Sequence, residues 1–175
     1  MQFSKSFFVA ALATLAAANS ANFVNQDSTT RHVVLTPSEG LAQIDGITIP
    51  GNSQATVEFP SGWTGNAYSY DDGEANVPGI LAEFAFDGYA GINFFDISAI
   101  VNPQATDGII MIYPTQAKTP LSGCLTIACS NQYNQPDDVA TQASSDSDFT
   151  VILGQRVQSA RRGISDIMAR THIQA

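Results

Sequence analysis

The sequence is poor in basic residues, and this shortage excludes a class of partner. Its 175 residues include 7 Lys and Arg against 16 Asp and Glu, which gives a formal net charge of −9 at pH 7. Nucleic-acid binding requires a basic surface that displaces counterions from phosphates, and anionic membranes likewise attract clustered Lys and Arg. We therefore expect neither nucleic acid nor an anionic membrane surface among the partners.

Histidine and cysteine are also scarce, with only His32, His172, Cys124 and Cys129 present. This count excludes zinc sites built from His and Cys, and the chain has neither a Gly-x-Ser-x-Gly motif nor a glycine-rich phosphate loop. The acidic turn at 70–79 could hold calcium, but it lacks the alternating ligand spacing of a calcium loop. We expect no metal and no cofactor.

A hydrophobic run of about 20 residues, the length needed to span a membrane, is missing as well. The nearest approach is the largely apolar stretch 7–18, which follows Lys5 and precedes a group of small residues. This order is typical of a secretory signal peptide, with cleavage between residues 18 and 21. The sequence predicts a signal peptide at 1–20 and a secreted, extracellular protein, in which Cys124 and Cys129 form a disulfide.

What dominates the chain from residue 22 to residue 154 is a series of short β-branched and aromatic segments bounded by Gly, Pro, Asn or Asp. The segments are 30–36, 44–50, 54–60, 66–70, 81–86, 92–98, 108–113 and 148–153. Many short strands at regular spacing predict an all-β sandwich or barrel in a single domain.

Residues 155–175 differ in character, because they contain four arginines against one aspartate. Their apolar residues recur at helical spacing, but isolated short helices are marginal in water. We expect a basic C-terminal extension, partly helical or disordered, outside a domain that spans 21–154. A wall-polyanion anchor and a helix docked on the acidic body are the alternatives.

Two acidic residues, Glu83 and Asp96, interrupt strand segments that are otherwise apolar. If 81–86 and 92–98 form a hairpin, both side chains can face one side of the sheet. Glycoside hydrolysis uses such a pair, about 5–5.5 Å apart for retention of configuration or about 6.5–9.5 Å apart for inversion. The alternative is structural, with each carboxylate accepting hydrogen bonds from the backbone.

Several segments resemble thaumatin-like proteins. The matching strings are "ANFVN", "FPSGWTGN", "GILAEFAFDG", "FFDISAIVNP", "CSNQYNQPDD" and "DFTVILG". The short length and two cysteines resemble, more narrowly, small secreted fungal members associated with the cell wall and with conidial germination. The resemblance implies a thaumatin-like β-sandwich over 21–154 with an acidic cleft that contains Glu83 and Asp96.

The resemblance also implies a ligand, the β-1,3-glucan of the cell wall. Sugar rings stack on aromatic faces, and Trp63, Tyr68 and Tyr89 are the candidates for this contact beside Glu83 and Asp96. We expect the protein to bind wall β-glucan during wall remodelling, as in spore germination.

Two departures from the family pattern favour binding over catalysis: Asn66 stands where the cleft has an arginine, and Val101 where it has an aspartate. The first alternative is a weak endo-β-1,3-glucanase with Glu83 as the acid and Asp96 as the nucleophile or base. The second is a surface adhesin whose partner is a wall or host protein.

Overall fold

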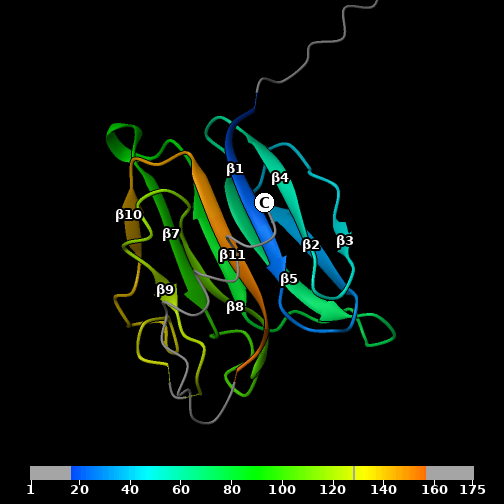
Figure 1. Ribbon diagram of the computed structural model, residues 1–175. Helices are drawn as coiled ribbons and strands as arrows, with labels where there is room; N and C mark the ends of the chain where they lie inside the picture. The colour runs from blue at the N-terminus through cyan, green and yellow to red at the C-terminus, as the bar shows by residue number, and fades with distance from the viewer. Residues whose placement is uncertain (1–16, 128, 157–175) are drawn as a thin grey trace, which may run out of the picture.

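The computed structural model of the protein describes residues 17–127 and 129–156. These residues form two β-sheets that lie face to face (Figure 1). The expected single-domain, all-β sandwich is thus confirmed. Most of the predicted signal peptide and the extension from residue 157 onward lie outside the described residues. No helix among the described residues has the length and apolar character needed to cross a membrane.

The first sheet has the strand order β4-β1-β11-β8-β9. Its strands are β1 (Ala17–Asn25), β4 (Gln54–Pro60), β8 (Asp107–Pro114), β9 (Ser122–Gly123) and β11 (Asp148–Gln155). Strands β1 and β11 run parallel, whereas the other neighbours in this sheet are antiparallel.

The second sheet has the order β10-β7-β6-β5-β2-β3 and is antiparallel throughout. Its strands are β2 (Arg31–Pro37), β3 (Ile47–Ile49), β5 (Thr64–Asp71), β6 (Leu81–Ala85), β7 (Asn93–Ser98) and β10 (Gln142–Ser144). A single turn of 3₁₀ helix, η1 (Tyr89–Gly91), joins β6 to β7.

Every strand segment predicted from the sequence is a strand in the structure. Strand β1 was not among those segments, because its first residues, 17–20, read as the small-residue end of a signal peptide. In the structure Ser20 pairs with Asp148 of β11, so pairing begins before residue 21. Strands β9 and β10 are only two and three residues long and carry no readable alternation.

Aromatic residues from both sheets fill the space between them. The Phe59 ring of β4 lies 4.9 Å from both the Trp63 and Phe86 rings, measured between centroids. Phe149 of β11 in turn lies 5.0 Å from Phe95 of β7. Burial of one such side chain stabilises the fold by about 1.5–3 kcal/mol, so this cluster is a major source of cohesion between the sheets.

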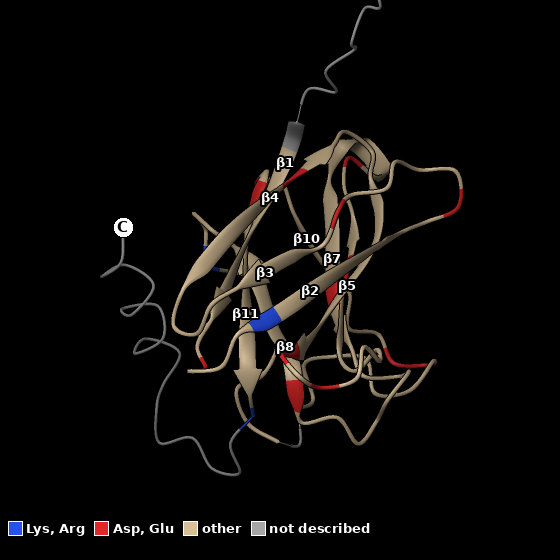
Figure 2. Ribbon diagram, turned by 90° about the vertical axis from the view of Figure 1, so that its right-hand side faces the viewer, with Lys and Arg blue, Asp and Glu red and all other residues tan. Residues whose placement is uncertain are grey.

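Acidic residues (red) outnumber basic ones (blue) over the described part of the sandwich (Figure 2). Three of the acids surround one buried cation: the Arg31 guanidinium, fully buried on β2, pairs with the carboxylates of Asp27, Asp71 and Asp107. Asp72 hydrogen-bonds to His32, with 2.8 Å between Oδ1 and Nε2. Two acids of the 70–79 turn, Asp71 and Asp72, therefore pair with the side chains of Arg31 and His32. The described residues contain no group of His, Cys, Asp and Glu that could hold a metal ion.

Candidate functional site

Glu83 and Asp96 lie side by side on the second sheet. Strands β6 and β7 pair antiparallel, and Glu83 is directly opposite Asp96 in their register. Successive side chains of a strand point to opposite faces. Because Phe84 and Phe95 belong to the buried core cluster, the two carboxyl groups project from the outer face of the sheet.

A row of polar side chains continues this pair across the sheet. On β5, Asn66 is the register partner of Glu83 and also of Thr36 on β2. On the other side, the Thr141 hydroxyl donates to Asp96, with 3.2 Å between Oγ1 and Oδ2. The row Thr36–Asn66–Glu83–Asp96–Thr141 thus spans the outer face of the second sheet from β2 to the segment that precedes β10.

This row borders a groove of about 360 Å³. The groove is lined by Ser38, Thr64, Gly65, Asn66, Glu83, Phe84, Ala85, Phe94, Asp96 and Thr141. Hydroxyl, amide and carboxyl groups predominate among these side chains, and the half-buried Phe94 contributes an aromatic ring. The groove therefore suits a ligand that carries many hydroxyl groups and some apolar surface.

The two carboxyl groups differ in their environment. Asp96 is 8% exposed, whereas Glu83 is half-buried. Burial, reinforced by the charge of Glu83 and by a hydrogen bond with it, raises the pKa of Asp96 to about 7, and the bond from Thr141 opposes this shift. No described N–H or hydroxyl group donates to Asp96 Oδ1. Near neutral pH, Asp96 is therefore protonated in a fraction of the molecules.

A carboxyl pair of this kind offers hydrogen-bonding groups to a ligand. Retaining glycosidases hold their two carboxyl groups about 5–5.5 Å apart on either side of the scissile bond, whereas Glu83 and Asp96 lie directly opposite each other on neighbouring strands and project from one face. Protonated Asp96 can donate a hydrogen bond, and Glu83 can accept one. The pair can therefore bind a hydroxyl group of a ligand in either direction.

The aromatic candidates lie elsewhere. Trp63 is 1% exposed, and its indole N–H donates to the carbonyl of Ala42 at 3.0 Å between Nε1 and O. A Cβ added at Gly65, a residue of the groove, would lie 2.7 Å from Trp63 Cη2, so the indole packs directly beneath the groove. The expectation that Trp63 stacks on a ligand is therefore corrected: its ring is enclosed and supports the groove from inside.

Neither tyrosine lines the groove. Tyr68 is 8% exposed, and its hydroxyl donates to Asn76, with 2.7 Å between Oη and Oδ1. Tyr89 is 88% exposed in η1, the turn between β6 and β7. A stacking role for Tyr68 conflicts with its burial, whereas Tyr89 is accessible but stands apart from the carboxyl pair. Two phenylalanines line the groove, and of these Phe94 is half-buried whereas Phe84 belongs to the core.

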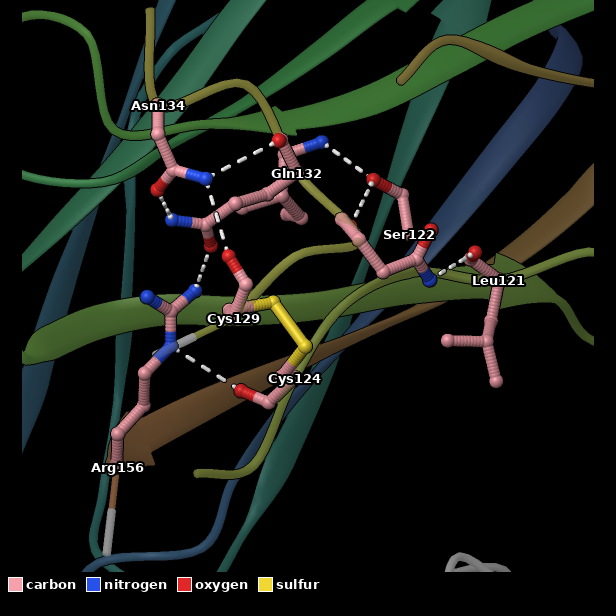
Figure 3. The surroundings of a disulfide bond; sticks show 9 residues. Leu121, Ser122, Cys124, Cys129, Gln132, Asn134 and Arg156 are labelled. Carbon is pink, nitrogen blue, oxygen red and sulfur yellow. Dashed lines mark hydrogen bonds between the residues drawn. A yellow bond between two sulfur atoms is a disulfide. The ribbon is translucent and has the colours of Figure 1, made fainter. Parts of the chain in front are cut away.

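The predicted disulfide is confirmed. Cys124 and Cys129 are bonded, with their Cα atoms 5.4 Å apart, and neither cysteine is free. The bond closes a short loop between β9 and β10 (Figure 3).

Three residues of the polar row or of the groove could not be singled out from the sequence: Thr36, Thr141 and Phe94. Alternation along the strands could have placed Thr36 and Phe94 on an outer face. Thr141 reaches Asp96 across 45 residues of chain, and no local pattern indicates that contact.

Comparison with known proteins identifies the family. The chain is 39% identical over 135 residues to the antigenic protein SchS21 of Stachybotrys chartarum, and the match covers 77% of this chain and 94% of that protein. This chain belongs to the SchS21 family. No established family model matches the sequence.

The fold also has a solved counterpart. The crystal structure of the protein elicitor MoHrip2 from Magnaporthe oryzae is similar with a TM-score of 0.58, over 78% of this chain and 98% of that one. Only 16% of the residues are identical, so this similarity concerns the fold.

The resemblance to thaumatin-like proteins is wrong. The relative SchS21, which the chain matches over 94% of that protein's length, belongs to another family, and so does the structurally similar elicitor. The strings that carried the resemblance are short strand-and-turn patterns, such as an apolar strand with one central acid, and a β-sandwich of another family can carry them too. The role in conidial germination rested on this resemblance and loses its basis.

Proposed function

We propose that the protein binds a neutral, hydroxyl-rich polysaccharide in the groove around Glu83 and Asp96, with cell-wall β-1,3-glucan as the first ligand to test. The observation that carries the proposal is the carboxyl pair itself: a buried, proton-retaining Asp96 beside a more accessible Glu83. Such a pair offers both a donor and an acceptor to sugar hydroxyl groups.

The surroundings of the pair support a neutral ligand. The flanking Asn66 and Thr141 side chains add an amide and a hydroxyl, and Phe94 offers an apolar face for the C–H surface of a sugar ring. A groove of about 360 Å³ lies at the small end of the range of ligand sites, about 300–1,000 Å³. Because the protein is acidic, an uncharged polymer can approach without electrostatic repulsion.

We also propose that the protein acts outside the cell, at the cell wall. The signal peptide predicted at 1–20 supports secretion, and the names of the antigenic relative and of the similarly folded elicitor fit a protein that other organisms encounter. Glucan binding would then hold the secreted protein at the wall.

A pull-down on insoluble β-1,3-glucan tests the proposal. We expect the parent protein to be retained and the Glu83→Gln variant to be retained at least about tenfold less, because a charged acceptor contributes about 1.5–3 kcal/mol. Glu58→Gln is the matched control, since Glu58 is exposed on β4 of the other sheet. A parent that stays in the supernatant, or equal retention of the Glu83 and Glu58 variants, would refute glucan binding in this groove.

The same preparations separate the two alternatives. We expect no release of reducing sugar from laminarin, because Glu83 and Asp96 project side by side from one face of the sheet instead of flanking a bond; release that Glu83→Gln abolishes would assign a glucanase instead. The antigenic and elicitor names favour a second candidate, recognition of a protein on another cell. Binding to a wall or host surface protein without retention on glucan would support that candidate.

A further inference from the structure

A second hollow, of about 500 Å³, lies beside the disulfide loop and shares no lining residue with the groove around Glu83. Its walls combine the apolar Pro103, Ala105 and Ile127 with the polar Thr106, Gln132 and Arg156. Since the proposed glucan site uses none of these residues, the hollow needs an explanation of its own.

Arg156 is the notable residue of this hollow. It is 9% exposed, and its backbone N–H donates to the carbonyl of Thr106 at 2.8 Å just after β11 ends. Its Nε donates to the carbonyl oxygen of Cys124 at 3.1 Å, and one terminal nitrogen donates to the side-chain oxygen of Gln132 (Figure 3). Gln132 is itself held by Asn134, with 2.7 Å between Nε2 and Oδ1.

All the partners of this guanidinium are uncharged. No salt bridge to Arg156 occurs among the described residues, and burial lowers its pKa to about 10 with no acidic group opposing the shift. Arg31, the other arginine that the structure describes, is also buried and has three carboxylates around it. A buried charge is costly unless it is paired, and Arg156 differs from Arg31 in having no carboxylate partner among residues 17–127 and 129–156.

The guanidinium also has donors to spare. Arginine carries five N–H donors in a planar fork. In the described structure the bonds of Arg156 involve Nε and Nη2 only, and Nη1 has no hydrogen-bond partner. Figure 3 shows this second terminal nitrogen turned away from Gln132 and from the disulfide. A ligand in the hollow can therefore reach a cation that is already held in place by Cys124 and Gln132.

We propose that this hollow binds the carboxylate of a small organic monoacid, with Arg156 as its counter-ion. A single cation matches a single negative charge, and the net charge of −9 repels dianions such as phosphate. The carboxylate accepts from Nη1, while Pro103, Ala105 and Ile127 contact the hydrocarbon part. The carboxylate can come from a free acid, which we favour, or from Asp166 of this chain, which follows Arg156 by ten residues.

Titration of the ¹⁵N-labelled full chain with sodium butyrate tests the proposal by NMR. We expect saturable shifts of the Arg156 Nε–H and of the Gln132 and Asn134 amides, and no such shifts with butyramide, which has the same shape but no charge. Equal shifts with butyramide, or larger ones with inorganic phosphate, would overturn the assignment to a monocarboxylate.

Variants locate the site. Arg156→Gln should weaken butyrate binding at least about tenfold, and Arg156→Lys should weaken it less because the charge remains. If Arg156→Gln does not fold, Ile127→Glu provides a second test. Ile127 is 39% exposed, and a glutamate at this position would compete with butyrate for the guanidinium. Ile127→Gln is the neutral control. Unchanged affinity in a folded Arg156→Gln variant, or in Ile127→Glu, would overturn the proposal. If butyrate binds to Asp166→Asn but not to the parent, the chain's own aspartate occupies the site, and the proposal of a free acid as the ligand is overturned.

Discussion

Replacing Asp96 with asparagine should stabilise the protein, and the gain should grow between about pH 4 and pH 7. Burial next to Glu83 raises the pKa of Asp96 from 3.8 to about 7 on folding. Between these values the unfolded chain releases a proton that the folded protein keeps, so each pH unit lowers the free energy of unfolding by about 1.4 kcal/mol. The full interval amounts to about 4 kcal/mol, which is the largest gain that the substitution can recover.

Urea unfolding of the parent and of Asp96→Asn at pH 4, 5.5, 7 and 8 measures this gain. Asp138→Asn is a control of opposite sign, because backbone N–H groups of Asn134 and Gln135 donate to Asp138 and lower its pKa. That substitution should lower the free energy of unfolding at pH 7, and this loss should shrink as the pH falls through the lowered pKa of Asp138. A difference between parent and Asp96→Asn that stays constant from pH 4 to pH 8 would refute the proposed burial of a proton-retaining carboxyl group.

Three further outcomes follow from the same contacts. Trp63→Ala should lower the free energy of unfolding by about 3–5 kcal/mol in urea titrations, because it empties a core position beneath the groove. Substituting Cys124 and Cys129 with serine should cost only about 2 kcal/mol by the same measurement, since the closed loop is short. Retention on β-1,3-glucan should fall above about pH 7 in pull-downs at graded pH, because Asp96 then loses the proton with which it donates; retention that rises with pH would contradict this role.

The fold was predictable because its signals are local. Alternation in segments such as 54–60 and 92–98 reports which residues face the core, and turn residues mark where each strand ends. The same alternation predicted that Glu83 and Asp96 share one face. The thaumatin resemblance used these same local strings, and that is why it suggested a sandwich correctly and a family wrongly.

The surroundings of the site were not predictable, since they depend on contacts between distant segments. Trp63 follows a turn and could have faced either side; its burial depends on Phe59 and on the carbonyl of Ala42. Thr141 joins Asp96 only because β10 pairs with β7. Arg156 reads in the sequence as part of a basic extension, and only the folded chain places it against Gln132.

A buried charge that serves the fold can be separated from one that serves a ligand by the sign of its effect on stability. Arg31 has three carboxylate partners, so Arg31→Met should leave them unpaired and cost about 3–5 kcal/mol in urea unfolding at pH 7. Asp96 faces another carboxyl group, so its neutralisation should stabilise the fold, and Asp96→Asn, which keeps an N–H donor, should maintain retention on glucan above pH 7. If Asp96→Asn instead destabilises the protein at pH 8 as Arg31→Met does, Asp96 belongs to the architecture of the sheet, and the groove loses the property on which its proposed function rests.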